Sequence, residues 1–310
     1  MKYPGNSYIP VVLLSIMMMF GSCQSGKKGS PVLIQDLDEV ENSGGIDSFN
    51  QIYHLYPSPA EMLGVIDMTH MKFDGSLLNP VERADQYLDS KAKTYVLGVY
   101  MTDLAYAALF NRHEETLDYL ETVKSLSEDI NINEAVDEAM ITKAKENVEY
   151  LDSLYIISND AFMNILSFCE INERSNTVVM LSAGAFTESL FLAVNMVKDF
   201  ASAGQLLQHL ADQKYTIDNF MMFAQSVESD DPGVKATIRD LEKIHSIYER
   251  IEPGLGAVSV TSSEGSEGQA KKLVIGGGSP ESSQPSLSEE DFESLKTAVI
   301  DLRTRIIEAN

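Results

Sequence analysis

The sequence predicts an all-α protein, a multi-helix bundle built around two central apolar helices. Apolar residues recur every three or four positions through most of residues 58–254, which is the period of an amphipathic helix. Capping signals precede several of these segments. Two segments, 94–111 and 177–197, each carry a single charged residue. A helix that is apolar on every side is buried, so we expect these two at the centre, with the amphipathic helices around them.

The individual helices follow from capping signals and from the spacing of apolar residues. Ser58-Pro59-Ala60-Glu61 forms a capping box that opens the first helix, and Asn79-Pro80-Val81-Glu82 opens the second in the same way. Short connections between the later segments favour antiparallel neighbours. The helices expected within the domain 51–254 are 58–71, 80–89, 91–110, 114–130, 134–154, 160–172, 177–200, 204–227, with a break near Thr216, and 232–253.

The last part of the chain separates into a Gly/Ser-rich segment and one more helix. Residues 255–286 are either a long loop or a small β-hairpin that pairs 257–261 with 272–275. Ser288 then caps an amphipathic helix within 287–310. Its apolar side predicts that this C-terminal helix docks on the helical domain.

The N-terminus has the features of an export signal. Lys2 precedes an apolar stretch at 9–20, which as a helix reaches only about 18 Å and is too short for a hydrocarbon core of about 30 Å. Phe20-Gly21-Ser22-Cys23 resembles the lipobox of bacterial lipoproteins. The resemblance implies that residues 1–22 are a signal peptide, that Cys23 is lipidated, and that acyl chains attach the protein to a membrane.

Residues 23–50 read as a flexible tether between this anchor and the helical domain, since they begin with small and polar side chains. Lys27 and Lys28 come before the first acidic residue, Asp36. Lipoproteins displayed on the outside of Bacteroidota-type cells usually carry acidic residues directly after the cysteine. We therefore expect a protein anchored in the cell envelope, in the outer membrane rather than the inner one, that faces the periplasm.

The net charge argues against a nucleic-acid-binding protein, and the cysteine content argues against an internal disulfide. The chain has 47 acidic and 23 basic residues, a net charge of −24, which opposes binding to nucleic acid. With Cys23 lipidated, Cys169 has no partner within the chain, so no internal disulfide is expected. Cys169 lies at helical spacing with apolar neighbours, and we expect a buried core thiol.

The single acids of the two apolar segments, Asp103 and Glu188, are the candidate functional residues. An unpaired charge in dry surroundings is costly, so each acid needs a partner or a proton. One interpretation is structural, with the acids tied to tyrosine hydroxyls or backbone amides, and Tyr100 and Tyr106 lie nearby in sequence. The other is a shared pocket for a cation or a polar ligand. In a third, one or both acids are exposed.

No catalytic motif is present, so the sequence favours a protein that is not an enzyme and uses no cofactor. Asp67/His70 and Glu242/His245 place a carboxylate three residues before a histidine, as ferritin-like bundles do. This pattern is frequent on acidic helices, and we predict no metal site from it.

Three stretches carry a resemblance to a known group: Tyr56-Pro57-Ser58-Pro59-Ala60-Glu61, the segment 97–106, and the segment 184–191. Together with the lipobox they resemble uncharacterised Bacteroidota lipoproteins. That resemblance implies an all-helical periplasmic domain and carries no activity. The resulting expectation is a helical module that binds a protein partner or supports an envelope complex. The alternative is a domain that binds a small ligand or metal through Asp103 and Glu188.

Overall fold

The computed structural model describes residues 58–68, 71–147, 150–227, 229–251 and 287–309. The predicted signal peptide, the Cys23 anchor, the tether and the hairpin at 255–286 lie outside these residues. Within them the chain is helical and contains no strand, which confirms the all-α prediction. The α-helices are α2 (Pro59–Met68), α3 (Ser90–Leu109), α4 (His113–Asp129), α5 (Glu138–Glu146), α6 (Leu151–Ile171), α7 (Ser175–Met196), α8 (Gly204–Ser226), α9 (Pro232–Glu249) and α10 (Glu289–Glu308).

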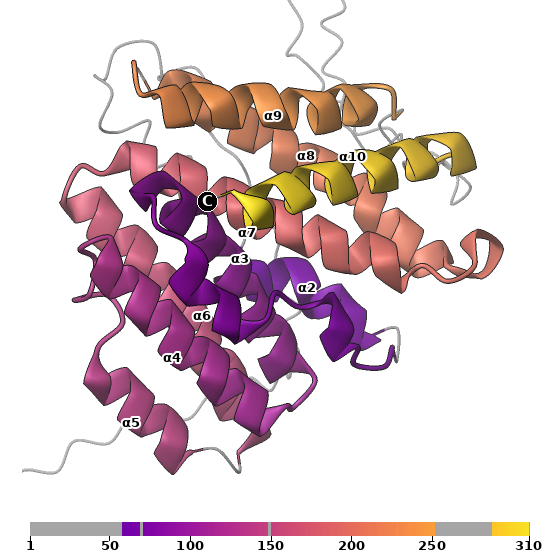
Figure 1. The fold of residues 1–310 in the computed structure, drawn as a ribbon. Helices are drawn as coiled ribbons and strands as arrows, with labels where there is room; N and C mark the ends of the chain where they lie inside the picture. The colour runs from indigo at the N-terminus through magenta and orange to yellow at the C-terminus, as the bar shows by residue number, and fades with distance from the viewer. Residues whose placement is uncertain (1–57, 69–70, 148–149, 228, 252–286, 310) are drawn as a thin grey trace, which may run out of the picture. The chain divides into compact units, whose positions relative to one another are not determined.

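The two apolar helices, α3 and α7, form the centre of the bundle, as predicted (Figure 1). They pack closely against each other because two glycines lie at their crossing. A Cβ added at Gly98 would collide with the carbonyl oxygen of Leu181, and one added at Gly184 would collide with the carbonyl oxygen of Tyr95. Glycine is therefore required at both positions for the two backbones to approach this closely.

The amphipathic helices cover this central pair. α4 and α6 pack against α3, and α5 packs against both of them, whereas α8, α9 and α10 contact α7. α10 lies along α7 and α9, so the end of the described chain returns to the central helices (Figure 1).

Local capping agrees with the sequence at both ends of the described chain. The amide of Ser58 donates to Glu61 Oε2 at 2.8 Å and the amide of Glu61 donates to Ser58 Oγ at 3.2 Å, the reciprocal pair of a capping box. Ser288 Oγ accepts from the amide of Asp291 at 3.1 Å at the start of α10.

The segment 80–89 was predicted as an α-helix and this prediction is wrong. The structure has a short 3-10 helix, η3 (Val81–Gln86), between extended residues. Long-range hydrogen bonds hold the segment: Arg83 Nη2 and the Tyr87 hydroxyl both donate to the carbonyl of Ile307, at 2.8 and 3.0 Å. These tertiary contacts override the local preference for an α-helix.

The predicted helices 134–154 and 160–172 are also divided differently. α5 begins only at Glu138, capped by Asp137, and ends at Glu146. α6 then runs without a break from Leu151 to Ile171, since Leu154, Ala161 and Ile165 continue one buried apolar side through the expected gap. The expected break near Thr216 is absent as well, because α8 is continuous from Gly204 to Ser226.

Among the described helices, α7 is long and apolar enough to cross a membrane. Almost all of its side chains are buried between the surrounding helices, including Glu188. Its composition is that of a central core helix.

Candidate functional site

The two predicted acids meet in the core. Asp103 on α3 and Glu188 on α7 are both fully buried, and Arg303 from α10 joins them. Arg303 Nε donates to Glu188 Oε2 at 2.9 Å, and its Nη2 donates to Glu188 Oε1 at 3.1 Å and to the carbonyl of Leu77 at 3.0 Å. The guanidinium also stacks 4.3 Å from the ring centroid of Phe191. Glu188 is thus held in a bidentate pair, which is the strong form of this interaction.

Asp103 has a different environment from Glu188. Its Oδ2 accepts the amide of Asn79 at 3.0 Å, and its Oδ1 is buried without a hydrogen-bond partner among the described residues. The carboxyl group lies close enough to Glu188 for the two to interact electrostatically. These two carboxyl groups can hydrogen-bond each other only when one of them carries a proton, because neither carboxylate can donate. Burial, and then the negative charge of Glu188, raise the pKa of Asp103 well above its ordinary value. Arg303 is paired with Glu188, whereas Asp103 has no cation of its own, so burial favours the protonated form of Asp103.

Several buried tyrosine hydroxyls bond the backbone at 74–80, which includes the short 3-10 helix η2 (Gly75–Leu77) and leads into η3. The hydroxyl of Tyr119 donates to the carbonyl of Asn79 at 3.0 Å, and that of Tyr100 donates to the carbonyl of Pro80 at 2.8 Å. The hydroxyl of Tyr106 accepts from the amide of Asp74 at 3.1 Å. A buried backbone without helical hydrogen bonds needs such partners. The need to bond this buried backbone explains why the otherwise apolar α3 carries Tyr100 and Tyr106.

The structure brings together only part of the predicted set. Asp103 and Glu188 are in contact, whereas the hydroxyls of Tyr100 and Tyr106 bond the backbone of the 74–80 segment. Asp103 accepts a backbone amide, as one form of the structural interpretation expects, whereas Glu188 is paired with Arg303, which was not predicted. Arg303 occupies the place that a bound cation would take, next to Glu188. No group of three or more metal-ligating side chains occurs in the part of the chain that the structure describes.

Sequence reasoning missed Arg303, although a signal was present. On α10 the buried residues Val299, Leu302 and Ile306 define the apolar side, and Arg303 lies within that stripe. A cation at a core-facing position indicates a buried anion opposite it.

Cys169 is a buried core thiol. Burial raises the pKa of this thiol to about 11, so it is protonated at neutral pH. His245 contacts Asp218, with 2.8 Å between Nε2 and Oδ1. That contact reaches α8 instead of forming a site with Glu242.

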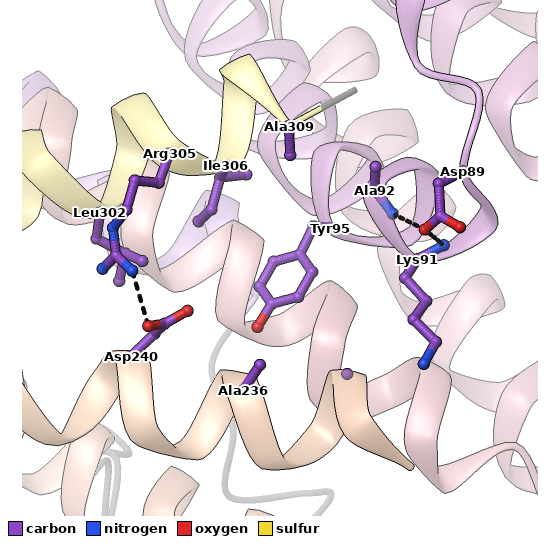
Figure 2. Close-up of a pocket in the computed structure, with 11 residues that line it drawn as sticks. Asp89, Lys91, Ala92, Tyr95, Ala236, Asp240, Leu302, Arg305, Ile306 and Ala309 are labelled. Carbon is purple, nitrogen blue, oxygen red and sulfur yellow. Dashed lines mark hydrogen bonds and ion pairs between the residues drawn. The ribbon is translucent and has the colours of Figure 1, made fainter.

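A cavity of about 290 Å³ opens between the N-terminal half of α3, the first turns of α9 and the end of α10 (Figure 2). The ring of Tyr95 stands between α9 and α10, and its hydroxyl is hydrogen-bonded to Thr237 Oγ1. Arg305 Nη1 pairs with Asp240 Oδ1 at 2.8 Å, and Lys91 Nζ pairs with Asp231 Oδ1 at 3.0 Å. The cavity thus combines charged groups with an apolar wall.

The outer face of α6 is a second surface feature. Ile156, Met163 and Ile171 are 52%, 38% and 78% exposed, and they recur at seven and eight residues, which places them on one side of the helix. Tyr150, directly before α6, is 66% exposed. These four exposed apolar side chains are called the apolar stripe of α6 below, and the polar residues Asp160, Asn164 and Ser167 lie between them.

No protein-family model, curated protein or solved structure matches the chain.

Proposed function

We propose that the protein is a membrane-anchored helical module that is not an enzyme and binds a protein partner through the apolar stripe of α6. The stripe of Ile156, Met163, Ile171 and Tyr150 is the observation that supports this proposal. Large apolar side chains clustered on a surface mark interaction sites, whereas isolated ones need no explanation. Apolar and aromatic groups with few charges are also the composition of an interface core.

The charges beside the stripe indicate the chemistry of the partner. Asp160 lies within the stripe, and Glu170 and Glu173 lie at its C-terminal end. The whole chain carries a net charge of −24. A complementary surface therefore has an apolar ridge bordered by lysine or arginine, and its association rate falls as salt is added.

The anchor is the second part of the proposal and rests on the lipobox at Cys23. Acyl chains on this cysteine hold the helical domain at the envelope, where a partner meets it by lateral diffusion. Labelling with a radioactive fatty acid tests this part: the wild type is expected to take up label and Cys23→Ala is expected to lose it. Equal labelling of the two would refute the anchor without affecting the stripe.

Photo-crosslinking in the native envelope tests the stripe. A photoreactive residue at Ile156 or Ile171 is expected to give one defined adduct, identified by mass spectrometry. Met163→Glu is expected to abolish that adduct. The control position is Glu242, which is exposed on α9. An equal yield from position 242, or an adduct unchanged by Met163→Glu, would contradict the proposal.

A further inference from the structure

We propose that the cavity between α3, α9 and α10 binds a small amphipathic anion, namely a medium-chain carboxylate of roughly ten non-hydrogen atoms. This inference is independent of the α6 stripe, because it concerns different helices and a different class of ligand. Its support comes from the size of the cavity, from the division of its lining into apolar and charged parts, and from the hydrogen-bond donors that remain available there.

The size of the cavity results from small residues that face each other. Ala92 on α3, Gly233 and Ala236 on α9, and Ala309 after α10 all line it. Its volume of about 290 Å³ corresponds to roughly ten water molecules at ~30 Å³ each. An eight-carbon carboxylate has the same number of non-hydrogen atoms.

The apolar part of the lining suits a hydrocarbon chain. Leu302 and Ile306 project from α10 on one side, and the ring of Tyr95 forms another wall (Figure 2). The Tyr95 hydroxyl is already bonded to Thr237, which is itself buried. Tyr95 therefore presents its ring to the cavity with no unmatched polar group, and this wall favours methylene groups over water.

The charged part of the lining favours a carboxylate. The ammonium group of Lys91 has three donors and, among the described residues, hydrogen-bonds Asp231 alone. Arg305 has five donors and uses Nη1 for Asp240. Both ion pairs are partly exposed and therefore weak, so a ligand carboxylate can join either cation at little cost.

The acids of the lining are already engaged. The carboxylate of Asp89 accepts the backbone amides of Lys91 and Ala92, at 2.9 and 3.2 Å, as the cap of α3. Asp240 is held by Arg305. Lys91 and Arg305 both keep N–H groups that these acids do not accept, and a carboxylate is the head group that such charged donors bind most strongly.

Binding of three probes of equal chain length to the full chain tests this inference. Isothermal titration with octanoate, octanol and octylamine is expected to rank them in that order, with octanoate at least tenfold tighter than octanol. Ala236→Leu fills the cavity and is expected to abolish octanoate binding. Ser246→Leu, on an exposed position of the same helix, is the matched control and is expected to leave binding unchanged.

A second variant separates the effect of the Arg305 charge on binding from the effect of the cavity volume. The Arg305 side chain is 58% exposed, so Arg305→Gln is expected to fold normally, to weaken octanoate about tenfold and to leave octanol unchanged. Circular dichroism of every variant verifies the fold. If Ala236→Leu unfolds, the inference is tested by the ratio of the octanoate affinity to the octanol affinity in Arg305→Gln. Equal affinities for the three probes, or octanoate binding unchanged in a folded Ala236→Leu or in Arg305→Gln, would overturn the inference.

Discussion

Replacement of Asp103 by asparagine tests the shared proton between the two core carboxyl groups. Asparagine has the same shape, keeps an oxygen for the amide of Asn79 and supplies an N–H toward Glu188. If Asp103 is protonated in the folded protein, Asp103→Asn retains every contact and removes the need for a proton. We therefore expect this substitution of a fully buried acid to be tolerated at low pH and stabilising at high pH.

The magnitude follows from proton linkage. A carboxyl whose folded pKa is raised binds its proton in the folded state but releases it in the unfolded state above about pH 3.9. The stability that Asp103 contributes is thus complete below that pH and is lost as the pH rises toward the folded pKa. The loss is about 1.4 kcal/mol per pH unit. Between pH 5 and pH 8 the free energy of unfolding of the wild type should fall relative to Asp103→Asn by up to about 4 kcal/mol.

Urea unfolding of the full chain, followed by circular dichroism at pH 5, 6.5 and 8, measures this difference. The wild type and Asp103→Asn are expected to differ least at pH 5 and most at pH 8, in favour of the variant. A variant that loses more stability at pH 8 than at pH 5 would show that Asp103 is a required carboxylate, and it would refute the proton assignment.

Four further substitutions test the packing, the buried ion pair and the backbone, and all are measured by thermal or urea unfolding. Gly98→Ala should cost about 3 kcal/mol, because the new Cβ meets the carbonyl of Leu181, whereas Gly64→Ala, with open space around it, should be neutral or stabilising by about 0.5–1 kcal/mol. Arg303→Met should cost about 3–5 kcal/mol, since it leaves a buried carboxylate unpaired; a loss below 1 kcal/mol would contradict this role. Glu173 has a φ of 54°, a left-handed backbone conformation that glycine adopts more easily. Glu173→Gly should therefore stabilise the protein by about 0.5 kcal/mol, and a lower unfolding midpoint would refute the inference that the backbone is strained there.

The central helices could be predicted from composition alone. The segments around Asp103 and Glu188 are apolar on every side, and only burial in a core or a membrane is compatible with that pattern. Capping signals were equally informative at Ser58 and Ser288, because a cap is a local interaction between residues three apart.

The errors occurred where distant residues determine local structure. The short 3-10 helix at Val81–Gln86 depends on the carbonyl of Ile307, more than 200 positions away in sequence. No local pattern contains that information. The partner of Glu188 lies 115 positions later, and its position in the apolar stripe of α10 indicated that Arg303 is buried but not which acid it meets. The sequence could indicate that the acids need partners, but only the three-dimensional arrangement identifies them.

The cavity could not be foreseen, because it results from the meeting of Ala92, Ala236 and Ala309 on three separate helices. The α6 stripe was more accessible. Ile156, Met163 and Ile171 have a visible helical spacing, but whether that side of a helix faces solvent depends on which neighbours cover it.

The contacts of α10 have a consequence for biosynthesis. A ribosome makes the chain from its N-terminus at about 5–20 residues per second, so Arg303 on α10 emerges after the helices α2 to α9. Until then Glu188 lacks its cation and the backbone at Leu77 lacks one of its donors. We therefore expect a chain that stops before α10 to be less stable than one that contains it, because its buried Glu188 carboxylate would have no cation.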